Sequence, residues 1–129
     1  MSKSFLLIGA ILAAISVVLG AFAAHGLRKI VPPESVTTFE TGVRYQFYHT
    51  FALLILAILI ERFPGSLMNW AGYCFIIGIL LFSGSLYLLA VLRTSETVGV
   101  KSVGLITPIG GLFFIAGWIL LFFGILKKS

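Results

Sequence analysis

The sequence has very little charge. Lysine, arginine and glutamate together make up 10% of the 129 residues, whereas charged residues form about a quarter of an ordinary soluble domain. Aspartate does not occur at all, so the four acidic residues are all glutamates. The low charge excludes a water-soluble globular domain, and the lack of aspartate excludes a Ser-His-Asp catalytic triad.

Cysteine is almost missing as well. Cys74 is the single thiol, so no disulfide can form within the chain. One cysteine and two histidines cannot supply the four ligands of a structural zinc site. The sequence also has no glycine-rich phosphate loop and no paired carboxylates within its apolar segments. We therefore expect a protein that is not an enzyme and has neither cofactor nor metal.

Long uncharged apolar segments are abundant. Hydrophobic residues make up 60% of the chain, and the mean hydropathy is +1.15. A helix rises about 1.5 Å per residue, so about 20 residues cross a hydrocarbon core of about 30 Å. We expect four such spans, at about residues 4–24, 42–62, 68–92 and 102–126. The sequence therefore predicts an all-α membrane protein, a four-transmembrane-helix bundle that forms a single integral membrane domain over residues 1–129.

The ends of these segments carry the basic residues. The first apolar segment exceeds the length of about 7–15 residues typical of a secretion signal, so we expect it to remain as a span. The net charge of +5 is spread over the segment ends, which favours contact with anionic headgroups over nucleic-acid binding. The partners that we expect are membrane lipids, with a second copy of the chain or another membrane protein as further candidates, and no nucleic acid. Basic residues are nearly balanced between the two faces, which leaves the orientation open.

The second span has an extension before it. Two prolines at positions 32 and 33 precede Glu34, and both residue types suit the first turn of a helix. Apolar residues then recur every three or four positions, at Val36, Phe39, Val43 and Phe47. We predict one long helix from about Glu34 to Arg62, in which an amphipathic extension precedes the second span. A separate short interfacial helix is the alternative.

Small and hydroxyl-bearing residues occur at positions that suit helix packing. Glycines seven residues apart favour a left-handed crossing near +20°. Pro108 removes one backbone hydrogen bond and should kink the fourth helix, and the nearby hydroxyls are candidates to satisfy the freed carbonyls. A broken helix that marks a substrate site is the alternative reading. The predicted helix-packing residues are Gly20, Ser83, Ser85, Thr107, Pro108, Gly110 and Gly117.

Polar side chains gather around the first connection. Because one loop joins the first two spans, we expect both histidines to lie toward the same membrane face. Glu40 and Arg44 are four residues apart, so we expect them to pair along the helix. Polar groups near lipid point to a ligand or proton-handling site, whereas histidines that bond free carbonyls would be structural. The candidate ligand-binding residues are His25, Glu40, Arg44, Tyr45, Gln46 and His49.

Four motifs occur in an order that resembles a known family. They are GAFAAHGL at residues 20–27, ETGVRYQFYH at 40–49, FSGSLY at 82–87 and TPIGG at 107–111. The chain resembles the family catalogued as domain of unknown function 423, which comprises small bacterial inner-membrane proteins with an animal transmembrane relative. The resemblance implies four membrane helices in the bacterial plasma (inner) membrane, and it implies no established activity. At Ala23, many members carry glycine instead.

These observations lead to one functional expectation and two alternatives. We expect a non-enzymatic helix bundle that interacts with lipid, a small hydrophobic ligand or partner proteins. One alternative is a small transporter or channel with a histidine-centred proton-handling or ligand site near one interface. The other is a redox protein that uses His25 and His49 to hold a metal or haem iron.

Overall fold

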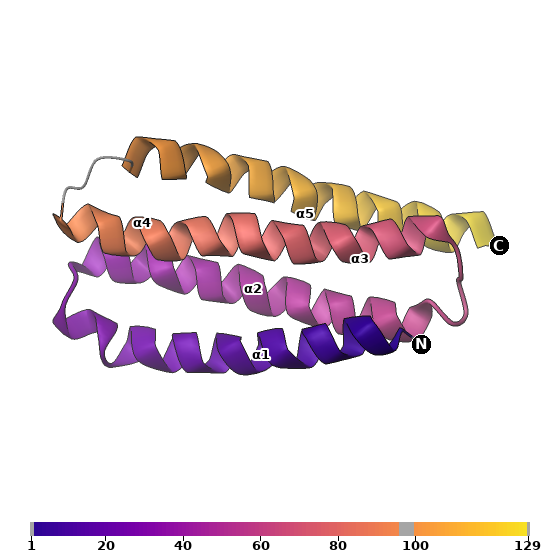
Figure 1. The fold of residues 1–129 in the computed structure, drawn as a ribbon, viewed down its shortest axis with the longest axis horizontal. Helices are drawn as coiled ribbons and strands as arrows, with labels where there is room; N and C mark the ends of the chain where they lie inside the picture. The colour runs from indigo at the N-terminus through magenta and orange to yellow at the C-terminus, as the bar shows by residue number, and fades with distance from the viewer. Residues whose placement is uncertain (1, 96–99, 129) are drawn as a thin grey trace.

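The computed structural model consists of long helices joined by short connections (Figure 1). It describes residues 2–95 and 100–128, and for residues 93–95, 100, 101 and 128 it describes the backbone alone. Four stretches of helix are long and apolar enough to cross a membrane, and no strand occurs in the described residues. The predicted fold class, an all-α membrane protein with four transmembrane helices, is therefore confirmed.

The first two spans are α1 (Lys3–Ala24) and α2 (Pro33–Leu59), which are linked by the short 3₁₀ helix η1 (Leu27–Lys29). The Ser2 hydroxyl accepts a hydrogen bond from the Phe5 amide and so caps α1 at its start. Proline at the first position of α2 suits a helix start, because its missing N–H would have no partner there. The amphipathic extension is continuous with α2, as predicted, and is not a separate interfacial helix.

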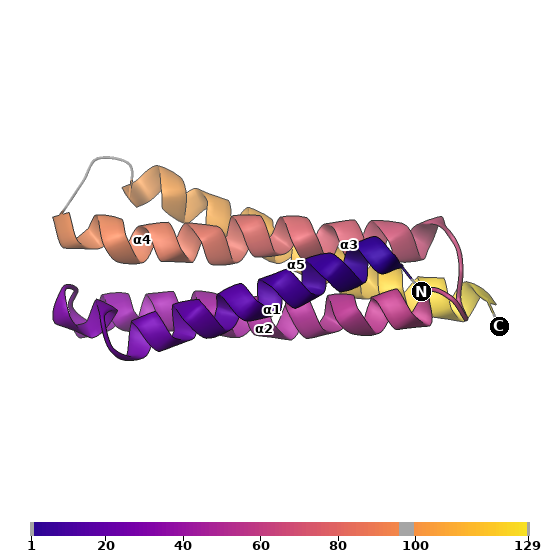
Figure 2. The ribbon, with the colours of Figure 1, turned by 60° about the horizontal axis from the view of Figure 1, so that its bottom comes forward.

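The third span has three parts. They are α3 (Ser66–Gly78), the π-helical turn η2 (Ile79–Ser83) and α4 (Gly84–Ser95), which follow one another without a break. The fourth span is α5 (Val100–Lys128), a continuous helix with Pro108 inside it. Both chain termini lie at one end of the molecule, beside the connection between α2 and α3 (Figures 1 and 2).

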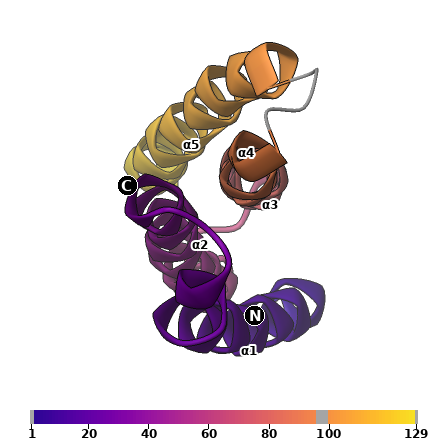
Figure 3. The same cartoon turned by 90° about the vertical axis from the view of Figure 1, so that its left-hand side faces the viewer.

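The helices are arranged around a central pair. The long helix α2 packs against α3 and α4, while α1 packs on α2 and α5 packs on α3 and α4. Seen end-on, α1 and α5 therefore lie at opposite ends of the arrangement (Figure 3). The first and last helices keep broad apolar faces that only lipid or another protein can cover.

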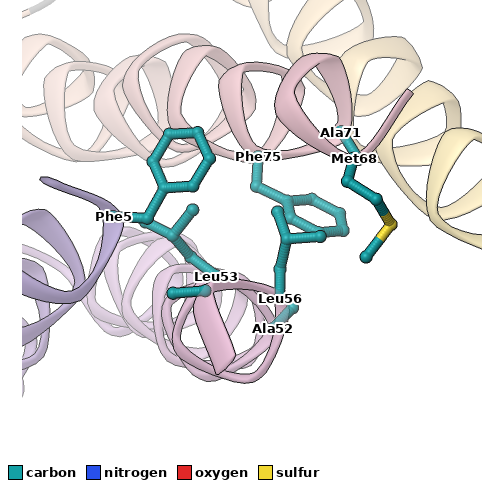
Figure 4. Close-up of a cluster of buried hydrophobic side chains, with 8 residues drawn as sticks. Phe5, Ala52, Leu53, Leu56, Met68, Ala71 and Phe75 are labelled. Atoms are coloured by element: carbon teal, nitrogen blue, oxygen red, sulfur yellow. The ribbon is translucent and has the colours of Figure 1, made fainter. Parts of the chain in front are cut away.

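Two groups of buried side chains lie toward opposite ends of the bundle. The first joins α1, α2 and α3 near the termini (Figure 4) and consists of Phe5, Ala52, Leu53, Leu56, Ala57, Met68, Ala71 and Phe75. The second joins the end of α1, η1, the start of α2 and α4, and consists of Ala23, Leu27, Val36, Phe39, Val43 and Ala90. The apolar stripe of the α2 extension is therefore part of the core.

The glycines of α5 are packed inside the molecule. A Cβ atom on Gly110 would clash with the backbone nitrogen of Phe82, in the π-helical turn. A Cβ on Gly117 would lie 2.7 Å from the Phe75 ring. Without side chains at these positions, α5 approaches the third span closely, as is usual where membrane helices pack tightly. Gly20 is less crowded, since a Cβ there would meet Val43 at an ordinary 3.6 Å.

Candidate functional site

The two histidines lie at different depths in the bundle. His25 follows the last residue of α1, and its exposed ring bonds the carbonyl of Ala21 at 3.1 Å. The neighbouring Phe22 ring packs edge-on against Phe39 of α2. His49 is ten residues beyond Phe39, which is about 15 Å further along the helix. The expectation that both histidines gather at one face is therefore wrong, because the packed extension of α2 places His49 in the middle of that helix.

The predicted pairing of Glu40 with Arg44 is also wrong. No ion pair joins these side chains in the part of the chain that the structure describes. Glu40 is half-buried, whereas Arg44 is exposed on the outer face of α2. A spacing of four residues brings such groups within reach, but the gain of about 0.3–0.5 kcal/mol is too small to hold a long side chain in place.

His49 uses both ring nitrogens in hydrogen bonds within the protein. Its Nδ1 lies 2.8 Å from the Tyr45 carbonyl, and the indole Nε1 of Trp118 donates to its Nε2 at 3.1 Å. A carbonyl can only accept, so the network assigns the hydrogen to Nδ1 and the lone pair to Nε2. A metal or haem iron bound at Nε2 would therefore have to displace Trp118. The described residues contain no group of three potential metal ligands.

Aromatic rings from four elements form one group with His49. Its ring stacks on Phe114 with centroids 3.5 Å apart and planes at 8°. Phe75 packs edge-on against Trp118, with centroids 5.1 Å apart. We call this group the aromatic cluster; it joins α2, α3, η2 and α5 and consists of Tyr45, His49, Phe75, Phe82, Phe114 and Trp118.

Sequence reasoning missed Phe114 and Trp118 as partners of His49. One signal was available for Trp118, which lies well inside an apolar segment, although tryptophan usually occurs at the membrane interface. An indole N–H at that depth needs a hydrogen-bond acceptor from another helix. The sequence gives no indication that His49 is this acceptor.

Gln46 connects three helices. Its Nε2 donates to the Leu12 carbonyl of α1 at 3.0 Å, and its Oε1 accepts from the Tyr87 hydroxyl of α4 at 2.6 Å. The same Leu12 carbonyl also accepts from Ser16 at 2.8 Å. The candidate residue Gln46 is therefore fully used in holding helices together, and Tyr87 is a partner that sequence reasoning did not single out.

The serine and threonine hydroxyls also join helices. Ser83 donates to the Gly42 carbonyl of α2 at 2.6 Å, and Ser85 bonds both Thr107 of α5 and the Phe82 carbonyl. We expected these hydroxyls to satisfy carbonyls freed by Pro108, and this is wrong for the two serines. Ser83 donates instead to the Gly42 carbonyl, and Ser85 donates to the Phe82 carbonyl of its own span.

Thr50 is the exception to this satisfied interior. Thr50 directly follows His49 in the sequence, and its side chain is fully buried. Among buried side-chain nitrogens and oxygens of the described residues, only its Oγ1 has no hydrogen-bond partner. An unpaired buried hydroxyl costs about 1–3 kcal/mol, so this position carries a local energetic penalty.

A cleft of about 370 Å³ opens beside the connection between α1 and α2. This connection lies at the end of the bundle opposite the termini (Figure 1). The cleft lies between η1 with its following loop and the first turns of α2. Its lining combines a cation, an anion, a hydroxyl and three apolar side chains, namely Arg28, Val31, Pro33, Val36, Thr37 and Glu40. Glu40, which forms no ion pair with Arg44, thus lies in a surface cleft and not in a site shared with His49.

Comparison with known proteins gives a consistent picture. A family model described as "Protein of unknown function (DUF423)" matches residues 19–111. The chain is 42% identical to the UPF0382 membrane protein YwdK of Bacillus subtilis, over 92% of this chain and 93% of that protein. It is 36% identical to the UPF0382 inner membrane protein YgdD of Escherichia coli, over 98% of this chain and 92% of that protein. A Haemophilus influenzae UPF0382 membrane protein is 40% identical over 100% of this chain and 98% of its own length. No solved structure matches.

Proposed function

The chain belongs to the DUF423 family and is a multi-pass protein of the bacterial inner membrane, and from this premise we propose that it is a non-enzymatic helix bundle whose outer surface binds membrane lipid. One observation carries the proposal. Within the described residues, every buried side-chain nitrogen or oxygen except Thr50 Oγ1 already has a hydrogen-bond partner. The polar interior thus acts as a scaffold.

Catalysis would need a polar group that can reach a substrate. His49 would be the natural proton-transfer group of the interior, but both its nitrogens are bonded and its ring is stacked on Phe114. His25 is accessible, yet its Nδ1 bonds the Ala21 carbonyl of its own helix. These arrangements support a structural role for the histidines.

The outer surface offers what the interior does not. Only four residues of α1 are buried, so most of its apolar side chains face outward. The outer face of α5 is similarly apolar, with exposed side chains that include Leu105, Leu112 and Phe122. The cleft beside η1 adds charged groups at one end of the bundle. Apolar faces combined with interfacial charge suit phospholipid, whose tails and headgroup match these two surfaces.

The transport alternative makes a different demand on the interior. A proton or solute path needs polar groups that are free to exchange partners along the span. Here Gln46 joins α1 to α4 and His49 joins α2 to α5, so opening a path would break contacts that hold the bundle together.

Lipid retention tests the proposal directly. The full chain is purified in a mild detergent, washed with excess detergent and analysed by native mass spectrometry. We expect phospholipid to remain bound in a fixed small number per chain. A protein that stays folded but retains no phospholipid, or that retains it only in proportion to the detergent micelle, would overturn the proposal.

A further inference from the structure

We propose that the cleft formed by η1, its following loop and the start of α2 binds one phospholipid headgroup that carries both a phosphate and a primary ammonium group. This inference rests on the proposed lipid-binding function and names the lipid class. Its central feature is a cation and an anion in one cleft, Arg28 and Glu40, which form no ion pair with each other in the described structure.

The depth of Glu40 in the membrane supports the proposal. With 27 residues, α2 is about 40 Å long, close to the thickness of a bilayer with its headgroups. Glu40 is seven residues after Pro33, about 10 Å from that end of the helix, which is close to the inner edge of a headgroup layer about 5–8 Å thick. A half-buried carboxylate at this depth is costly without a cationic partner.

The cleft also contains the complementary charge, on Arg28 of η1. Arg28 is exposed, and a guanidinium group can donate two parallel hydrogen bonds to a phosphate. Val31, Pro33 and Val36 also line the cleft, so it has apolar surface for the glycerol and the first acyl carbons. The cleft thus combines partners for a phosphate and an ammonium group with apolar surface.

The Thr37 hydroxyl in the cleft favours a ligand that donates hydrogen bonds. Thr37 uses its hydrogen to bond the Pro33 carbonyl at 3.2 Å, so its oxygen keeps lone pairs that can accept. Together with the Glu40 carboxylate, this makes two acceptors for N–H groups. A primary ammonium has such hydrogens, whereas a quaternary ammonium has none, and a purely anionic headgroup would be repelled by Glu40.

The chain provides matched control positions. Glu34 is on the same helix and Lys29 is next to Arg28, yet neither lines the cleft. Each control residue carries the same charge as its counterpart in the cleft, so replacing it by glutamine alters the net charge by the same amount. Both control residues are exposed.

The test uses the full chain in mixed micelles with equal amounts of phosphatidylethanolamine, phosphatidylcholine and phosphatidylglycerol, and retained lipid is quantified by mass spectrometry. We expect the parent to retain phosphatidylethanolamine at about three times the level of phosphatidylcholine, the size expected of one partly exposed charge pair. Glu40→Gln should abolish this preference, while Arg28→Gln should lower retention of all three lipids. Glu34→Gln and Lys29→Gln should behave as the parent.

Glu40→Asp guards against a merely structural effect. It keeps the carboxylate, so we expect it to restore most of the preference that Glu40→Gln loses. Equal retention of all three lipids by the parent, enrichment of phosphatidylglycerol, or an equal loss in Glu34→Gln would each overturn the headgroup assignment. In these three outcomes lipid is still bound, so they leave the proposed lipid-binding function intact, whereas the detergent-wash experiment alone decides that function.

Discussion

At the scale of single residues, His49 shows how a polar side chain is accommodated among apolar helices. Its Nδ1–H is satisfied within its own helix, by the Tyr45 carbonyl, while its Nε2 accepts from Trp118 of α5. The ring faces Phe114 at stacking distance, so it also contributes contact area. A residue that looks catalytic in the sequence is thus a neutral hydrogen-bond acceptor between helices.

Replacing His49 or Trp118 should measure this contact. We expect His49→Ala to lower the free energy of unfolding by about 2 kcal/mol, because it leaves an indole N–H unpaired and a gap beside Phe114. Trp118→Phe should couple to it by about 0.6–1.7 kcal/mol in a double-mutant cycle. Unfolding in sodium dodecyl sulfate, followed by circular dichroism, provides the measurement.

The other histidine serves as the control. His25 is exposed and bonds a carbonyl of its own helix, so His25→Ala should change the free energy of unfolding by less than about 0.5 kcal/mol. Equal losses for His25→Ala and His49→Ala, or additive effects of His49→Ala and Trp118→Phe, would show that the Trp118 contact does not stabilise the bundle.

Thr50 provides a second prediction at this scale. Thr50→Val replaces an unpaired buried hydroxyl by a methyl group of the same shape, so we expect the free energy of unfolding to rise by about 1 kcal/mol. Thr41→Val is the control, since the Thr41 hydroxyl bonds the Thr37 carbonyl at 3.0 Å and its loss should bring no gain. If Thr50→Val proves less stable than the parent under the same unfolding conditions, the hydroxyl has a partner in the membrane.

At the scale of elements, the contact between α5 and the third span depends on glycine. Gly110 lies against the backbone of Phe82, in the π-helical turn, and Gly117 lies against Phe75. A π-helical turn changes the direction in which its residues face, and here it presents Phe82 to α5 while Ser83 reaches Gly42 of α2. The turn thus lets one span contact two neighbours at the same depth.

This geometry predicts a difference between two glycines of α5. Gly110→Ala places a methyl group against the backbone nitrogen of Phe82, which cannot move aside as a flexible side chain can, so we expect the free energy of unfolding to fall by about 1–3 kcal/mol. Gly104→Ala meets no atom within 4 Å and should be neutral or stabilising, by up to about 1 kcal/mol from helix propensity. Thermal unfolding in detergent would compare the two, and similar values would contradict close packing at Gly110.

At the scale of the whole molecule, the bundle has a polar framework centred on α2. Hydrogen bonds from its side chains or carbonyls reach α1 through Gln46, η2 and α4 through Gly42 and Gln46, and α5 through His49. The helices α1 and α5 lie at opposite ends of the arrangement, each with a broad outward apolar face (Figure 3). The molecule therefore has two outward apolar sides, as the proposed lipid-binding function requires.

Flux through reconstituted vesicles tests this description. Because the interior polar groups are engaged in contacts between helices, we expect vesicles with the parent protein to leak protons no faster than protein-free vesicles, as followed with a trapped pH-sensitive dye. His49→Ala should leave the rate unchanged. Proton flux in the parent that falls on His49→Ala would favour the transport function instead.

Much of the architecture follows from local sequence features. Hydropathy and length predict four spanning helices, and the prolines with the apolar stripe that follows predict a single long α2. The two histidines were misplaced relative to each other because the sequence does not show that Val36 and Phe39 are packed in the core. The Glu40–Arg44 pairing failed for a related reason, since spacing shows which side chains are within reach and not which are held together.

The sequence by itself determined that this protein lies in a membrane and crosses it as helices, because the long apolar segments lack the polar–apolar alternation of barrel strands and a helix pairs every backbone amide within one segment. Tertiary structure alone decided which polar atoms meet. His49 and Trp118 are 69 residues apart, and their contact depends on how α2 and α5 cross. Gly110 meets Phe82 because of a π-helical turn whose position only packing sets. Hydrophobicity acts on each segment independently, whereas hydrogen bonds between helices depend on the relative position of two segments.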